Sequence, residues 1–134
     1  MTPAMTPARA RRRLEDAILS MGPAELIEVV LDHALMRLQC LRDAGPDAPW
    51  DSVRPHLQGC QRAVTLLLEG LVSPQAKVDA RTQELAGDLR SLYLWIIQQL
   101  VKADVQRTRP PVEDLTRVLE DIADGWKRGV LGRS

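Results

Sequence analysis

Four segments of the chain repeat apolar residues every three or four positions, and connections that contain proline separate them. The clearest series is in the second segment, where the steps are four, three, four, three and four: Val53, Leu57, Cys60, Val64, Leu67 and Leu71. Such spacing places all of these side chains on one face of an α-helix. No segment shows the apolar–polar alternation of a half-buried strand. The sequence therefore predicts an all-α protein.

The expected helices cover residues 23–43, 50–72, 78–105 and 111–128. Four amphipathic helices with short connections favour an antiparallel four-helix bundle, which we assign to residues 23–130. A chain of 134 residues is long enough for one such domain. We expect residues 1–22 to form a mobile basic tail that includes a short additional helix over residues 8–19, ahead of the break at Gly22-Pro23.

Composition excludes several classes of protein. The 18 Lys and Arg residues balance the 18 Asp and Glu residues, so no overall field favours nucleic acid or a membrane surface. No apolar run approaches the roughly 18 residues of a membrane-spanning helix. The charged stretch "ARARRRLEDAILS" is unlike a secretory signal. Two cysteines without a CxxC pair indicate reduced thiols, and we expect a cytoplasmic protein.

Residues suited to catalysis or metal binding are present but not in a useful pattern. Two His–Cys pairs, His33 with Cys40 and His56 with Cys60, have spacings that match no common zinc framework. His33 and Cys40 are about two helical turns apart, too far to form a catalytic couple. No Glu-x-x-His pair suits a di-iron site. We therefore expect no enzymatic activity, no metal and no cofactor.

Three of the expected helices carry more apolar surface than one buried face requires. In the third, we assign Leu85, Leu89, Leu92, Tyr93, Ile96 and Leu100 to the core. A second stripe lies beside it: Leu94, Ile97, Val101 and Val105. Trp95 lies on the remaining polar arc. The first helix has a weaker second strip of Val29, His33, Met36 and Cys40. The second helix has a strip of mostly small residues, which predicts a shallow trough: Gly59, Ala63, Leu66 and Gly70.

Surplus apolar stripes on a soluble monomer indicate a partner site. One alternative is that the short N-terminal helix covers a stripe through Leu14 and Ile18. Both readings can hold together, because a displaceable cover protects a binding groove. Another alternative is a self-associating structural or regulatory bundle, in which the stripes form a homodimer; we favour a monomer.

Three stretches of the sequence resemble a known family. "GPAELIEVVLDHAL", "LRSLYLWIIQQLVKAD" and "VLEDIADGWKRGV" are similar, in order and spacing, to the first helix, third helix and ending of the flagellar export chaperone FliS. The matching positions are Pro23, Leu26, Ile27, Asp32, Ala34, Leu92, Tyr93, Ile97, Leu100, Ala103 and Trp126. The family usually has a tail tyrosine that caps its groove, and this tail has none. His33 replaces a family glycine, and Leu94 a polar residue.

The resemblance implies an antiparallel helical bundle without enzymatic activity or cofactors. It implies that the partner is the disordered C-terminal segment of newly made flagellin. Binding would prevent flagellin from polymerising in the cytoplasm and deliver it to the flagellar type III export gate. Terminal flagellin segments are amphipathic, and a shallow apolar groove is a surface on which such a segment folds as a helix.

Overall fold

The computed structural model describes residues 23–71 and 80–131. They form four helices: α2 (Pro23–Asp43), α3 (Trp50–Glu69), α4 (Ala80–Gln106) and α5 (Val112–Leu131). No strand occurs in these two stretches, so the all-α prediction with four long helices is confirmed. The expected N-terminal helix over residues 8–19, with Leu14 and Ile18, lies outside the described residues.

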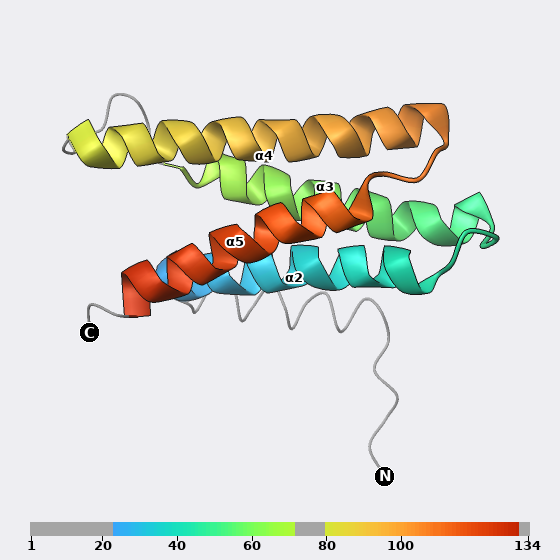
Figure 1. The fold of residues 1–134 in the computed structure, drawn as a ribbon, viewed down its shortest axis with the longest axis horizontal. Helices are drawn as coiled ribbons and strands as arrows, with labels where there is room; N and C mark the ends of the chain where they lie inside the picture. Colours follow the sequence, from blue (N-terminus) through green and yellow to red (C-terminus); the bar gives the residue numbers. More distant parts are fainter. Residues whose placement is uncertain (1–22, 72–79, 132–134) are drawn as a thin grey trace, which may run out of the picture.

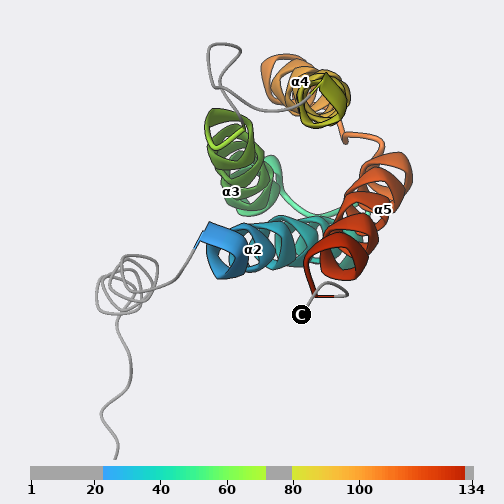
Figure 2. The ribbon, with the colours of Figure 1, turned by 90° about the vertical axis from the view of Figure 1, so that its left-hand side faces the viewer.

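The helices surround a common core in the ring order α2, α3, α4, α5 (Figure 2). Successive helices run in opposite directions along the long axis (Figure 1). Helix α2 packs on α3 and on α5, and α3 packs on α4. Helices α4 and α5, although consecutive in the chain, contact each other far less than these three pairs do. The ring is therefore most loosely packed between α4 and α5.

Helices α3 and α4 end where the local chemistry favours an end. Helix α3 stops before Gly70, whose N–H donates to the Leu66 carbonyl at 3.1 Å. Helix α4 stops before Arg107, which has a φ of 52° and lies in the left-handed region. The N–H of Thr108 then donates to the Ala103 carbonyl at 3.0 Å, and that of Arg107 to the Asp104 carbonyl at 3.4 Å. This is the Schellman arrangement, and the prolines that follow prevent the helix from continuing.

The core is made almost entirely of aliphatic side chains. Within the described residues its largest fully buried members come from all four helices: Leu31, Leu38, Leu57, Ile96, Leu100, Leu115 and Leu119. The predicted series on α3 is confirmed from Val53 to Leu67, and Leu71 packs on its edge. No charged side chain is buried among the described residues. Apolar burial thus dominates the stability of the bundle.

Two residues of the predicted α4 core are misassigned. Leu85 is 60% exposed and Leu92 is 38% exposed, whereas Tyr93, Ile96 and Leu100 are buried. At about 100° per residue, Leu85 and Leu92 lie on the edge of the buried face that is directed away from α3. That edge faces the loosely packed side of the ring. The small side chains of Ala86 and Ala103 are buried as well.

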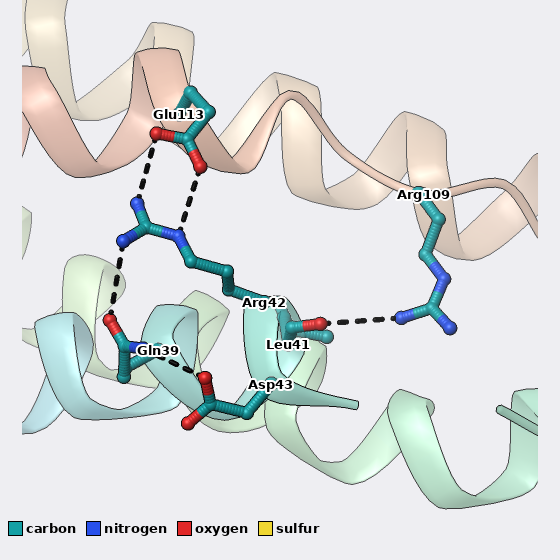
Figure 3. Close-up of polar contacts among 6 residues, drawn as sticks. All are labelled: Gln39, Leu41, Arg42, Asp43, Arg109 and Glu113. Atoms are coloured by element: carbon teal, nitrogen blue, oxygen red, sulfur yellow. Dashed lines mark hydrogen bonds and ion pairs between the residues drawn. The ribbon is translucent and has the colours of Figure 1, made fainter. Parts of the chain in front are cut away.

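A polar cluster fastens the end of α2 to the beginning of α5 (Figure 3). Arg42 contacts both carboxylate oxygens of Glu113, at 2.9 and 3.1 Å, which is the bidentate geometry of a strong pair. Arg109, from the connection before α5, donates to the carbonyls of Leu41 and Gly45. The last carbonyls of a helix have no partner within it, so Arg109 satisfies one that α2 leaves open.

Candidate functional site

Helix α4 carries most of the exposed apolar surface of the described chain. The large apolar residues with exposed side chains are Met36, Leu66, Leu85, Leu92, Leu94, Val101 and Val105, and all but the first two are on α4. Isolated exposed apolar residues are ordinary, but several along one helix form a patch. The residues of the described chain thus place the candidate binding surface on α4 and its neighbours.

The predicted second stripe of α4 lies on the flank that faces α3; we call it the α4 strip. Asp104 marks this flank, because its carboxylate accepts from Arg54 of α3 at 3.0 Å. The helical period puts Ile97 and Val101 nearest to Asp104, with Leu94 and Val105 farther round the helix toward its outer side. Leu94, Val101 and Val105 are exposed, and Ile97 is half-buried against the core. The α4 strip is therefore continuous apolar surface with its base on the bundle.

The predicted trough on α3 is not one accessible surface. Ala63 is buried in the core. A Cβ built on Gly59 would lie 2.8 Å from Nε of Arg37, so α2 already uses the space that this glycine leaves. Leu66 is 54% exposed, and Gly70 caps α3. The small residues were expected to leave a trough open to a partner. At Gly59 this space is taken by the side chain of Arg37 of α2.

The extra strip of α2 lies on the outer side of this helix, next to the seam with α3. Met36 is exposed, Val29 and His33 are half-buried, and the Cys40 thiol lies 3.9 Å from the sulfur of Met36. Leu66 lies across the seam on the corresponding flank of α3 by its helical phase. We call Val29, Met36 and Leu66 the α2–α3 strip. It differs from the α4 strip because a second polar cluster, around Arg37, lies within it.

That polar cluster joins the two histidines of the chain to Arg37. Nη1 of Arg37 lies 3.1 Å from Nδ1 of His56 on α3. His33 precedes Arg37 by one turn of α2, and burial, followed by the positive charge of Arg37, lowers its pKa from 6.5. His33 therefore stays neutral at pH 7. This cluster could not be predicted from the sequence, because its members come from two helices and meet only in the bundle.

The three remaining predicted positions have separate surroundings. Asp32 is exposed on α2. Tyr93 is buried, and that burial raises its pKa to about 12. Trp126 packs on the core from α5. Trp95 packs on the core from α4, although the helical pattern had placed it on the polar arc of that helix. Tyr93 and Trp126 thus support the bundle, and the described contacts assign no partner to Asp32.

The described residues offer little for catalysis. No group of three or more His, Cys, Asp or Glu side chains in them lies close enough to hold a metal ion. Burial raises the pKa of the Cys60 thiol to about 12, so it carries no thiolate at neutral pH. None of the described helices is long and apolar enough to cross a membrane. The surface formed by the two strips offers a partner apolar contacts and one local positive charge.

Comparison with known proteins gives one consistent result. A family model described as "Flagellar protein FliS" matches residues 5–131. The flagellar secretion chaperone FliS of Salmonella typhimurium (strain LT2) is 27% identical over 125 residues, covering 90% of this chain and 86% of the relative. That of Escherichia coli (strain K12) is 25% identical over 134 residues, covering 96% and 91%. No solved structure matches the chain.

Proposed function

The chain belongs to the FliS family of flagellar secretion chaperones, and from that premise we propose that it binds the disordered C-terminal segment of flagellin. Binding would keep the segment from polymerising in the cytoplasm and hold it ready for the flagellar export gate. The proposed surface consists of the α4 strip and the α2–α3 strip. The function is binding rather than catalysis.

The observation that carries this proposal is the exposed apolar surface of α4. Leu94 and Val101 are 42% and 39% exposed on a flank where Ile97 connects them to the core. A flexible amphipathic segment would fold as a helix on such a surface, with its apolar side toward the strip. The departure from the family pattern at Leu94 increases the apolar area available to a partner.

Magnitudes require the partner to cover more than the α4 strip. Complete burial of a Val, Leu or Ile side chain stabilises by about 1.5–3 kcal/mol. Leu94, Ile97 and Val101 are already more than half covered, whereas Val105 is 78% exposed, so together the strip would contribute about 3–5 kcal/mol. Ordering a disordered segment costs about 2–5 kcal/mol, so the α4 strip alone leaves little net affinity. Contact with the α2–α3 strip supplies the remainder.

Charged replacements in the α4 strip test the proposal. A flagellin C-terminal peptide from the same organism is titrated into the wild-type protein and into the Leu94→Glu/Val101→Glu double variant. We expect the variant to bind at least about 100-fold more weakly, because bound peptide would trap unpaired carboxylates against apolar groups. Circular dichroism should show an unchanged helical signal, since both side chains are exposed.

The matched control places two glutamates on the polar arc of the same helix. Ser91→Glu/Gln106→Glu adds the same two negative charges at exposed positions outside the strip and should bind like the wild type. Equal loss in both variants would indicate a general charge effect and remove the strip assignment. Sedimentation of the free protein supplies a second check. A stable dimer that the same strip variant dissociates would favour the self-associating bundle instead.

A further inference from the structure

Arg37 lies across the seam between α2 and α3, in the space beside Gly59. Its Nη1 atom lies 3.1 Å from Nδ1 of His56, and its Nε atom lies 2.8 Å from the place where the Cβ of a larger residue at position 59 would be. A larger residue at position 59 would make the arginine side chain shift. In the observed position the guanidinium lies against α3, with its charge at the seam.

The charge of Arg37 has no carboxylate partner in the described part of the chain. The described ion pairs belong to other cations: Arg42 with Glu113, Arg54 with Asp104 and Lys127 with Glu28. Nε of Arg37 is buried and has no acceptor among residues 23–71 and 80–131. A partly buried guanidinium without a counter-charge is costly, because it has lost water without gaining an anion. A partner that supplies a carboxylate removes that cost.

Both histidines beside Arg37 can add hydrogen bonds to such a carboxylate. A guanidinium only donates, so Nδ1 of His56 must accept from Arg37. With Nδ1 accepting, the ring proton of His56 is on Nε2, which is a donor. His33 is also neutral at pH 7 and has one ring N–H to donate. The cluster is therefore positively charged and rich in donors.

The cluster interrupts the α2–α3 strip, which fits one kind of occupant. Met36 of α2 and Leu66 of α3 are both exposed, and their helical phase places them on the outer sides of the two helices next to this seam. A helical segment along the seam would bury apolar residues on them and bring one polar position over Arg37. We propose that Arg37, with His33 and His56, binds an Asp or Glu side chain of the flagellin segment. This inference rests on the function proposed above.

The experiment compares two arginines of one helix. Arg37→Gln and Arg42→Gln each remove one positive charge from α2, but Arg42 pairs with α5 on the opposite flank. Titration of the flagellin C-terminal peptide into full-length protein should show Arg37→Gln binding about tenfold or more weakly, as loss of a charged hydrogen bond predicts. Arg42→Gln should bind like the wild type. Arg37→Lys keeps the positive charge but lacks the paired N–H donors of a guanidinium, so its affinity for the peptide should be intermediate.

Peptide variants separate recognition from a structural role of Arg37. Each acidic residue of the peptide is replaced in turn by its amide. One replacement should weaken binding to the wild type about tenfold and have little further effect on Arg37→Gln, which is the signature of a direct pair. If no acidic residue couples to Arg37, or if Arg37→Gln binds like the wild type, the inference is wrong.

The two proposals fail in distinguishable ways. Peptide binding that needs Leu94 and Val101 but no acidic residue keeps the chaperone function and removes the carboxylate site. The scan of acidic peptide residues against the wild-type protein tests the carboxylate site even if Arg37→Gln unfolds. Absence of any binding by the wild-type protein removes both. A cluster that instead holds a second copy would appear as a dimer that Arg37→Gln dissociates, and that also overturns the inference.

Discussion

Helices α4 and α5 bury similar inner faces but present different outer ones. Both contribute fully buried leucines to the core, Leu100 from α4 and Leu119 from α5. The outer side of α5 is charged: Glu113, Asp114, Arg117, Glu120, Asp121 and Asp124. No large apolar side chain of its described part is exposed, whereas α4 exposes five. A bundle needs one apolar face per helix, so α5 matches its structural role and α4 carries more than stability requires.

The largest effect should come from the inner faces, where the two helices are alike. Ile96→Ala on α4 and Leu119→Ala on α5 each empty a position with no solvent exposure. We expect each to lower the free energy of unfolding by about 2–5 kcal/mol, from lost transfer energy and the cavity that remains. Urea denaturation measures the change. A cost below about 1 kcal/mol at Ile96 would mean that the inner face of α4 is not a core face.

Alkaline pH should affect α4 through its buried tyrosine. Burial raises the pKa of Tyr93 from 10.0 to about 12, so the folded protein keeps a proton that the unfolded chain loses. The contribution of the protonated Tyr93 side chain to the free energy of unfolding is complete below pH 10 and is lost as the pH rises toward 12. Stability measured against pH should fall in this range, and Tyr93→Phe should reduce the slope. The buried residues of α5, Leu115, Leu119 and Ala123, do not titrate.

Part of the alkaline slope should remain in Tyr93→Phe, because Cys60 on α3 has a pKa raised by burial from 9.0 to about 12. Cys60 acts in the same direction, since its thiol is protonated in the fold and ionised in the unfolded chain. Absorbance of the phenolate gives an independent measurement, as Tyr93 is the only tyrosine. Ionisation of Tyr93 near its ordinary pKa in folded protein would contradict the buried position.

The smallest effect on stability should come from the outer side of α4. Leu85→Gln replaces a side chain that is 60% exposed, and we expect a change within about 0.5 kcal/mol. Ile122→Gln on α5 is the comparison, because Ile122 is half-buried against the core and should cost clearly more. Thermal unfolding of the two variants decides the order. A large loss from Leu85→Gln would contradict the exposed position of this leucine.

The sequence was sufficient for the helices and most of the buried positions. Periodicity alone predicted α2 over the residues that form it, and it predicted the buried series of α3 from Val53 to Leu67. It placed Leu85 and Leu92 in the core because a helical period defines the direction of a face but not whether a neighbour covers it. The loose contact between α4 and α5 is a property of the assembled ring.

The candidate surface, too, could be predicted only in part from the sequence. The α4 strip could be predicted because all its members belong to one helix and share one phase. The contact of Arg37 with Gly59 and His56 could not, because it depends on the register of α2 against α3. The cap that Arg109 provides for α2 was missed for a similar reason, since the two positions are 68 residues apart. Long-range polar contacts carry no periodic signal.

The pairing of α2 with α5 also bears on the order in which the chain folds. Arg42 and Glu113 are separated by 71 residues, whereas α2 and α3 are joined by a short loop. Closing a long loop costs more entropy, so contacts between sequence neighbours form first and distant ones later. During synthesis α2, α3 and α4 leave the ribosome before α5. Until α5 arrives, the α5-facing side of α2 remains open to other apolar chains, and completion of the C-terminus closes it.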